Sequence, residues 1–578
     1  MKHKLTYFTL LLLITITFLK AQVVYKLHVI NTDSQSVFKK ISYKKQLNSK
    51  EFVFNEANKV YVSLINEGYI TANIDSIVPD FQTYRVYISA GKKYKWVDLR
   101  YSKKDQGVIN KIGYNERFFS NRSFRFNELS KFMEKVILYY ENNGYPFVSA
   151  KLDSIEFKDA GIRAKLRVDK NIFIKLDSLV TEGSGKVSQK FLLRYLGIKN
   201  GMPYNAEVFR GASKKIRQLP FLTEKKPPVI QLTDKQNKLI LFLEKRNASQ
   251  FDGIVGILPN DKGKTVFTGD LKIKLVNNIL KTGETFDINW RRLQTQTQDL
   301  KASVIYPYIG GLPVGADYTI KIYKKDSTFL DVNNAIGLNY YFSGLNYIKV
   351  FYKQRNANLL STAGLENIKI LPEYADVITK AYGAGVFFEK MDYRFNPRKG
   401  VGLNVLGSVG SRQIRKNPKI NDVAYSTIAL KSSQYQVEGT VVGYVNPVKN
   451  HVLKVSTQFG SVFGNTIYRN ELFRIGGLRT LRGFDEESIF ASTYVIPTIE
   501  YRFLFEQNSN LFLFAEGAWY ENHSVSSNFD DTPISVGAGI NFETKAGIFN
   551  LSYAIGKQFG AGFDMRIGKI HAGLTALF

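Results

Sequence analysis

The chain has 578 residues, too many for one ordinary hydrophobic core, so several domains are expected. Its hydrophobic content of 44% excludes wholesale disorder, and its mean hydropathy of −0.18 argues against a bundle of membrane-spanning helices. The net charge of +30 requires an acidic partner or surface, and the absence of cysteine excludes disulfides, thiol catalysis and a lipid-modified N-terminal cysteine.

The N-terminus indicates an export signal. Two lysines precede a largely apolar run over residues 5–19, and the small residue Ala21 stands before Gln22. A membrane anchor would need roughly 20 apolar residues, so we expect residues 1–21 to be a cleaved signal peptide. An exported chain seldom meets nucleic acid. Anionic lipid head groups or a channel lined with Lys and Arg therefore match the positive charge better, and no nucleic-acid partner is expected.

Two stretches repeat in the first half of the chain. "LINEGYITANIDSI" (64–77) and "YENNGYPFVSAKLDSI" (140–155) each run from a helix through Gly-Tyr into a strand ending in Asp-Ser-Ile. A weaker third copy covers 180–245. Strands that open the three units begin 71 and 79 residues apart, at 23–30, 94–101 and 173–180. Three strand–helix–helix–strand–strand units are expected, over residues 22–92, 93–171 and 172–246.

Units of this size and order resemble polypeptide-transport-associated (POTRA) domains. The segment "GIKNGMPYNAEVF" (197–209), with the later "RQLPFL", resembles the POTRA domain that adjoins a barrel. A generic α+β periplasmic repeat is the alternative interpretation.

From about residue 250 the helical periodicity gives way to alternation. In 265–276, 317–323 and 535–543, apolar residues occupy every second position and polar residues the positions between them. A soluble sandwich would bury the apolar face, whereas an outer-membrane barrel turns it to lipid. The last strand, 568–578, ends on Phe578, with Leu574 and Ala576 on the same face, and this ending resembles the C-terminal insertion signal of such barrels. We predict an antiparallel transmembrane barrel of about 16 strands over 247–578.

The stretch "FRIGGLRTLRGFDEESI" (473–489) stands out among the strands. POTRA-like repeats before a barrel resemble the outer-membrane assembly-factor superfamily of the BamA and TamA type, whose members carry a loop folded into the barrel lumen. That loop has Gly-Gly, a spacer, and Val/Ile/Leu-Arg-Gly-Phe/Tyr. The matching residues here are Gly476, Gly477, Leu481, Arg482, Gly483 and Phe484. "DYRFNPRKG" (392–400) matches a second family pattern of strand and turn.

The resemblance implies acidic partners for the loop arginine, whose rigid guanidinium can pin a loop to carboxylates on the barrel wall. Glu500 stands where the family places one of them. At the second place the family has an aspartate two residues before a glycine, where this chain has Ala515, with Glu516 one position later. A one-residue shift changes the face of a strand, so Glu516 is expected to face lipid unless a bulge or realignment turns it inward. It stays the second candidate partner.

The resemblance further implies a Gram-negative outer-membrane protein, with its repeats in the periplasm, that inserts, assembles or translocates other proteins without covalent chemistry. Incoming strands would be templated at POTRA edges and at a weak seam between the first strand, near Gly253, and the last, 566–578. Expected partners are outer-membrane lipids, unfolded outer-membrane or secreted proteins, and a periplasmic or inner-membrane-spanning protein. Three repeats match TamA-like members better than the central assembly factor, which usually carries five.

Two alternatives stay open. One is a two-partner-type secretion pore for a dedicated exported protein, although such pores usually carry a plug helix and two POTRA domains. The other is a passive porin or a barrel enzyme. The five histidines are scattered and none has a partner at metal-site spacing, so no catalytic residue, metal or cofactor is expected.

Overall fold

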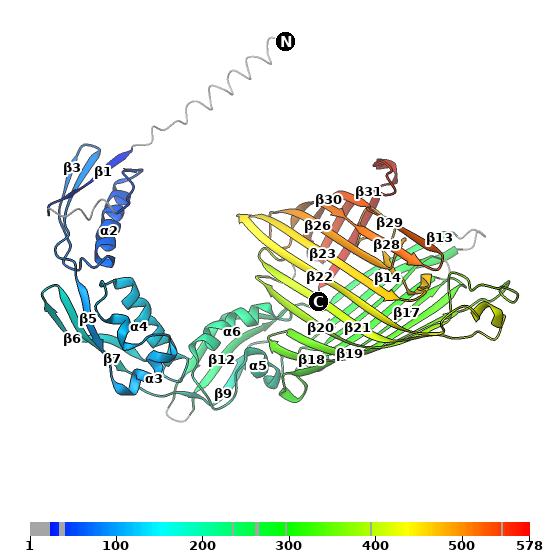
Figure 1. Ribbon diagram of the computed structural model, residues 1–578, viewed down its shortest axis with the longest axis horizontal. Coiled ribbons are helices and arrows are strands. Elements are labelled where there is room, and N and C mark those ends of the chain that lie inside the picture. The colour runs from blue at the N-terminus through cyan, green and yellow to red at the C-terminus, as the bar shows by residue number, and fades with distance from the viewer. Residues whose placement is uncertain are drawn as a thin grey trace, which may run out of the picture. The chain divides into compact units, whose positions relative to one another are not determined.

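The computed structural model describes residues 24–33, 41–233, 236–259, 265–294, 297–393, 396–544 and 547–577 (Figure 1). The expected signal peptide and Phe578 lie outside these residues. The chain divides into two compact units, Met1–Lys175 with Pro203–Ala206 and Leu176–Met202 with Glu207–Phe578. No helix among the described residues is long and apolar enough to cross a membrane.

Three small α+β repeats come first, and the structure confirms this part of the expected fold class. In the first repeat, one described helix packs on a sheet of order β2-β1-β4-β3, and residues 34–40 lie outside the description. Ser49 caps this helix by accepting a hydrogen bond from the backbone N–H of Phe52 at 3.3 Å. Its elements are β1 (Tyr25–Asn31), β2 (Gln46–Leu47), α2 (Lys50–Asn66), β3 (Asn73–Asp80) and β4 (Thr83–Ser89).

The second repeat places its opening strand parallel to its last strand, as the first does (β1 with β4, β5 with β7), and in the third repeat β9, its second strand, is parallel to the last strand β12. The second repeat comprises β5 (Lys95–Arg100), α3 (Lys103–Lys111), η2 (Glu116–Phe119), α4 (Phe126–Glu141), β6 (Ser149–Lys158) and β7 (Gly161–Asp169). The third comprises β8 (Lys175–Leu176), β9 (Ser178–Glu182), α5 (Gln189–Leu196), β10 (Met202–Pro203), α6 (Ala206–Gln218), β11 (Leu222–Gln231) and β12 (Lys238–Lys245).

The repeated Asp-Ser-Ile motif marks a β-bulge. In β3 the register with β4 shifts between Ile74 and Ser76, and in β6 the register with β7 shifts between Asp153 and Glu156. Ser154 adopts a positive φ of 50° there. Both β3 and β6 are edge strands of their sheets. A bulge bends an edge and limits indiscriminate pairing with other chains, which gives the repeated motif a structural role.

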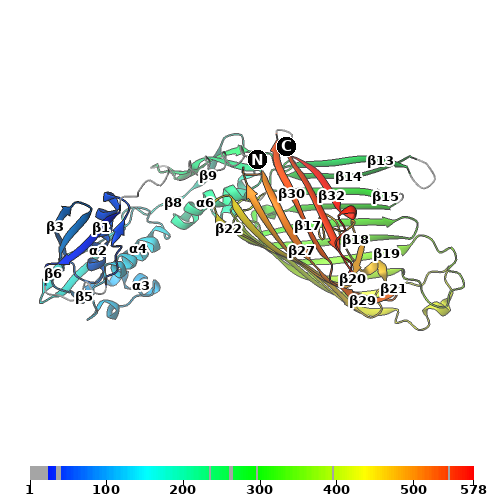
Figure 2. The same cartoon turned by 90° about the horizontal axis from the view of Figure 1, so that it is seen from above.

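A closed antiparallel barrel follows (Figure 2). The expected number of about 16 strands is confirmed for the described residues. β27 continues into β28, and β29 into β30, because β26 pairs with both β27 and β28 and β27 pairs with β30. The segments are β13 (Gln250–Pro259), β14 (Thr265–Val276), β15 (Thr285–Gln294), β16 (Thr297–Tyr306), β17 (Val314–Lys325), β18 (Phe329–Ser343), β19 (Asn346–Leu359), β20 (Val377–Met391), β21 (Gly400–Ile414), β22 (Lys431–Val448), β23 (His451–Gly464), β26 (Thr493–Leu504), β27 (Asn510–Gly517), β28 (Trp519–Ser524), β29 (Ser527–Asp531), β30 (Ile534–Thr544), β31 (Gly547–Lys557) and β32 (Lys569–Leu577).

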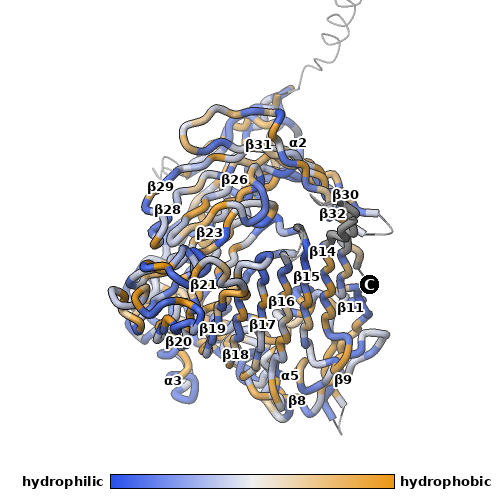
Figure 3. Tube along the Cα trace, turned by 90° about the vertical axis from the view of Figure 1, so that its right-hand side faces the viewer, coloured by the Kyte–Doolittle hydropathy of each residue, from blue (hydrophilic) through white to orange (hydrophobic). Residues whose placement is uncertain are grey.

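The apolar face of the strands points out of the barrel. On β18, Ile336 is 57% exposed and Leu338 is 55% exposed. Asn339, the next residue after Leu338, points inward and is 1% exposed. The same alternation of hydrophobic and hydrophilic residues runs along β14 to β18 in Figure 3. An outer surface of this kind requires a hydrocarbon solvent, and the inner face is left polar.

The barrel closes through a short seam. β13 pairs with β32 only at Gln250↔Leu577 and Phe251↔Ala576 among the described residues. By comparison, the ladder from β13 to β14 runs along the whole of β13, and that from β31 to β32 runs from Ile548 to Ala554. The two terminal strands therefore leave most of their facing backbone groups without each other as partners.

Candidate functional site

The loop that links β23 to β26 is a hairpin with its own hydrophobic contacts. β24 (Phe473–Ile475) pairs antiparallel with β25 (Ile489–Ala491), so residues 476–488 form its tip. A 3-10 turn, η5 (Arg469–Glu471), precedes β24. Leu481 and Phe484 of the tip are buried in a cluster with Ile496 of β26 and Tyr520 of β28. The loop is thus held against the inner wall by packing as well as by charge.

Arg482 lies between both carboxylates proposed from the sequence. Its Nη1 donates to Glu500 Oε2 at 2.9 Å and its Nε donates to Glu516 Oε1 at 2.6 Å. The backbone N–H of Arg482 donates to the other oxygen of Glu516 at 2.8 Å, and the guanidinium lies 3.4 Å from the centre of the Phe514 ring. Glu500 also accepts from Arg502, with Nε to Oε1 at 2.7 Å. Charge-assisted bonds of this geometry fix the position of the loop strongly.

Glu516 points inward with no bulge in the ladder between β26 and β27, so the realigned alternative applies and the lipid-facing orientation is wrong. In β27 the even-numbered residues from Asn510 to Glu516 are buried, while Leu511 and Leu513 are exposed on the outer face. The register pairs Thr498 with Glu516, which puts Glu500 and Glu516 on the lumen face of adjacent strands. The two outward leucines decide the face of the strand, because lipid contact favours them over a carboxylate.

The glycines of the loop have different roles. Gly476 and Gly477 have φ of 111° and 88°, a backbone region that only glycine adopts without strain. Gly483 is a point of close approach between the loop and the barrel wall. A Cβ there would lie 2.6 Å from the backbone nitrogen of Gly556 on β31, and the Gly483 N–H donates to Ser535 Oγ at 2.9 Å.

A second anchor, which the sequence did not reveal, holds the start of the loop. Glu471 accepts from Arg412 of β21, with Nε to Oε1 at 2.7 Å and Nη2 to Oε2 at 2.6 Å, and the two side chains are 2% and 1% exposed. Arg355 of β19 donates to the Glu471 carbonyl at 3.2 Å and pairs with Asp331. Here the arginines belong to the wall and the carboxylate to the loop, the reverse of the Arg482 anchor.

The acidic tip of the loop reaches both sides of the seam. Glu487 pairs with Arg291 of β15 at 2.7 Å, and Asp485 pairs with Lys569 of β32 at 2.6 Å. His571 Nε2, also on β32, lies 2.8 Å from the carbonyl oxygen of Arg482. The loop therefore bridges the third and the last strand of the barrel from inside.

The other proposed site residues lie at the seam and the end of the chain. Gly253 pairs with Leu271 of β14, and Leu574 and Ala576 lie on β32, Leu574 on its exposed face. Ala576 is one of the seam residues.

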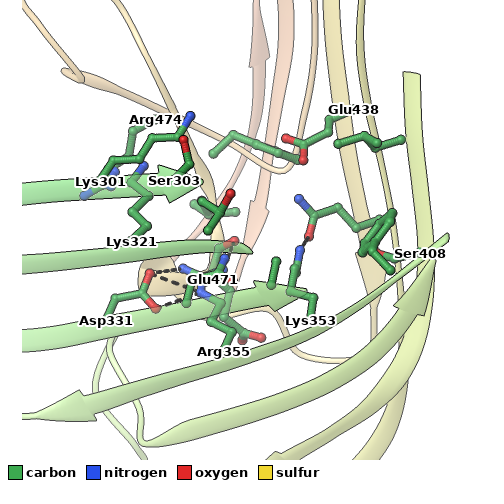
Figure 4. Close-up of a pocket in the computed structure, with 18 of the residues that line it drawn as sticks. Lys301, Ser303, Lys321, Asp331, Lys353, Arg355, Ser408, Glu438, Glu471 and Arg474 are labelled. Atoms are coloured by element: carbon green, nitrogen blue, oxygen red, sulfur yellow. Dashed lines mark hydrogen bonds and ion pairs between the residues drawn. The ribbon is translucent and has the colours of Figure 1, made fainter. Parts of the chain in front are cut away.

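Beside the loop is a polar cavity of about 580 Å³ (Figure 4). Lys301 of β16 and Lys321 of β17 face each other in register, and Figure 4 shows them grouped with Ser303 and Arg474. Asp331 pairs with Arg355 on another wall of the cavity. Among the described residues, no group of three or more His, Cys, Asp or Glu could hold a metal ion.

A barrel with an apolar outer face, preceded by α+β repeats and holding an inward-folded loop, defines an outer-membrane protein of a Gram-negative bacterium. A model of the Omp85 superfamily domain matches residues 278–571, more than half of the chain, and the chain belongs to this superfamily. Members of the superfamily are non-enzymatic assembly or secretion barrels that act on proteins.

Solved structures are similar to this chain at low identity. CdiB from Escherichia coli is 12% identical, with a TM-score of 0.52 over 92% of this chain and 98% of that one. BamA from Haemophilus ducreyi lacking POTRA domains 1–3 is 15% identical, with a TM-score of 0.43 over 84% of this chain and 100% of that one. CdiB from Acinetobacter baumannii is 14% identical, with a TM-score of 0.49 over 84% and 90%. No curated protein matches the sequence.

Proposed function

We propose that this protein inserts or assembles other proteins in the outer membrane and that it is a TamA-like member of its superfamily. Residues 22–92, 93–171 and 172–246 act as three periplasmic POTRA domains, and 247–578 as the insertion barrel. Substrates are unfolded outer-membrane or secreted proteins, and a periplasmic or inner-membrane-spanning protein assists. The number of repeats supports the TamA-like assignment.

The observation that carries this proposal is the seam of two residue pairs, Gln250↔Leu577 and Phe251↔Ala576. Separating β13 from β32 breaks only these two residue pairs, so it costs less free energy than separating any other two neighbouring strands of the barrel. Unpaired N–H and C=O groups of β13 and β32 then offer a template to an incoming strand, which gains backbone hydrogen bonds there. The edge strands β3 and β6 of the periplasmic repeats offer further pairing sites beyond their bulges.

A disulfide across the seam tests the proposal. Phe251 and Ala576 are register partners across the seam, so cysteines at these two positions can form the disulfide. Oxidised Phe251→Cys/Ala576→Cys should lose insertion of a reporter barrel into vesicles, to near background, and regain it with reductant.

The matched control is Val350→Cys/Ala384→Cys, a register pair of the long β19–β20 ladder that should insert normally when oxidised. The chain has no other cysteine to interfere. Undiminished insertion by the oxidised seam pair would refute the seam mechanism.

A second candidate is a secretion pore for a dedicated exported protein. The polar cavity beside the loop favours it, because the acidic tip of the loop is held there by ion pairs that can open. A pore requires the loop to leave the lumen, whereas insertion at the seam does not. An Asp485→Cys/Lys569→Cys tether should block a pore and spare an insertase.

A further inference from the structure

A second cavity, of about 380 Å³, lies where the third repeat meets the barrel rim. Helix α6 lines one side, and the β18–β19 turn with the end of β20 and the two residues after it, Asp392 and Tyr393, lines the other. Phe191 of the repeat packs edge-on against Tyr308 of the barrel, with their ring centres 5.6 Å apart, and this contact holds the repeat on the rim. Within the repeat, Tyr195 Oη donates to the Lys215 carbonyl at 2.8 Å. The cavity is therefore part of one compact unit.

The walls of this cavity combine apolar side chains with lysines. Leu345, Phe388 and Met391 supply apolar surface, and Lys214, Lys215 and Lys390 supply three ammonium groups. Within the described part of the chain, the ammonium groups of Lys214 and Lys390 have no hydrogen-bond or ion-pair partner. Lys215 is half-buried, donates to the Leu196 carbonyl at 2.8 Å, and has its pKa lowered by burial.

The same cavity is also lined by two carboxylates, those of Glu389 and Asp392. Asp392 accepts from the backbone N–H groups of Arg398 and Lys399, both at 3.0 Å. Glu389 belongs to the lumen face of β20, as does Phe387, which stacks on Tyr347 of the lumen cavity. Backbone groups thus occupy the Asp392 carboxylate, and the three lysines outnumber the two carboxylates of the cavity.

The outward-facing stripe of β20 ends at this cavity. Even-numbered residues of β20 face outward, as the 71% exposure of Tyr382 shows, and this stripe continues through Phe388 to Lys390. A lysine that ends a lipid-facing stripe places its ammonium among head groups. Because the third repeat packs on this end of the barrel, the leaflet is the periplasmic one.

We propose that the cavity binds an anionic phospholipid of the periplasmic leaflet. The phosphate lies between Lys214, Lys215 and Lys390, and the glycerol and upper acyl chain lie against Leu345 and Phe388. Basic pockets at the edge of a transmembrane region recognise anionic head groups in this way, and the volume suits a head group. This site is separate from the seam and the lumen loop, and it adds a lipid ligand to the proposed function.

Native mass spectrometry of the full-length protein in detergent tests the site, with phosphatidylglycerol, phosphatidylcholine and inorganic phosphate as probes. The wild type should retain phosphatidylglycerol about tenfold more strongly than phosphatidylcholine. Lys214→Gln/Lys390→Gln should remove this preference. Lys380→Gln is the control, since it changes an exposed lysine on the same face of β20, toward the other end of the strand.

A second variant fills the cavity without changing its charge. Gly211 lies in α6, lines the cavity, and a Cβ there would meet nothing within 4 Å. Gly211→Phe should therefore abolish binding while α6 is retained. Gly107→Phe, in an equally open position of α3, should not.

Three outcomes would overturn the proposal: equal retention of the two lipids, unchanged binding in Lys214→Gln/Lys390→Gln and Gly211→Phe, or competition by inorganic phosphate with no lipid retained. The last would indicate a free-phosphate site. Heat-modifiable migration on gels verifies that each variant has a folded barrel.

Discussion

At the scale of single residues, Arg482 joins the loop to two strands through separate carboxylates. Glu500 and Glu516 are both buried, so each depends on the guanidinium for its charge balance. Glu500 has additional cations in Arg502 and Lys454, whereas Glu516 has Arg482 as its ion-pair partner among the described residues. Removal of Arg482 therefore affects Glu516 most.

Arg482→Ala should leave a folded barrel with a loosened loop. Removing one partner of a buried ion pair costs about 3–5 kcal/mol, and here the loss lowers the free energy with which the loop binds the barrel wall. Limited proteolysis should cleave residues 476–488 faster, and insertion activity should fall. Arg479→Ala is the control, since this exposed arginine of the same loop has no side-chain partner among the described residues and should cost within about 0.5 kcal/mol. A fully active Arg482→Ala with a protease-resistant loop would contradict the anchor.

How much of the site could be predicted depends on how local its signal is. Arg482 lies in a contiguous motif with its glycines, so the sequence pointed to it directly. The lipid-facing orientation expected for Glu516 rested on the assumption that the family position, here Ala515, points inward. That assumption was wrong, because the outward-facing Leu511 and Leu513 turn Glu516 to the lumen. Arg412 and Glu471 are 59 residues apart, and only the strand register and the fold of the loop bring them together.

At the scale of elements, the turn 277–284 connects β14 with β15 and holds the third repeat. Glu284 is fully buried and its carboxylate accepts from the backbone N–H groups of Ile279, Leu280 and Thr282 at 2.8–2.9 Å. Burial raises its pKa, but these backbone hydrogen bonds outweigh burial and leave the pKa below its ordinary value. The Lys281 carbonyl of this turn accepts a hydrogen bond from the backbone N–H of Ser188 in the third repeat at 2.6 Å.

Glu284→Gln should loosen the junction of the third repeat and the barrel by about 1–3 kcal/mol at neutral pH. Because the folded pKa is lowered, the contribution of Glu284 is present above the ordinary pKa and is lost as pH falls through the lowered one. Limited proteolysis near residues 246–249 should therefore increase at acid pH in the wild type and much less in Glu284→Gln. Glu182→Gln, an exposed position on β9, should behave as the wild type. Identical acid profiles for the wild type and Glu284→Gln would exclude this role.

Strand periodicity predicted the barrel and its strand number well, because alternation is a local pattern that lipid and lumen impose on each strand. The repeats were recognised from Asp-Ser-Ile, yet the bulge at Ser154 could not be read from those letters. A bulge is defined by the partner strand, so it appears only once β6 and β7 are paired.

At the scale of the whole molecule, the seam and the loop are coupled. The acidic tip binds Arg291 on β15 and Lys569 on β32, so it spans β13, β14 and the gap between the terminal strands. Opening the seam must separate these two contacts or rotate the tip with one side. In the proposed mechanism, the loop holds the seam closed until a substrate strand replaces its pairing.

The most direct measurement of the central claim is a site-specific photo-crosslink from β13 to an unfolded outer-membrane protein during insertion. A photoreactive side chain at Phe251, the seam partner of Ala576, should capture the substrate's strand. The same group at Val350, on the exposed face of β19 far from the seam in strand order, should not. Adducts at Phe251 alone agree with strand templating at the seam, whereas equal adducts at both positions, or none at Phe251 while insertion proceeds, would contradict it.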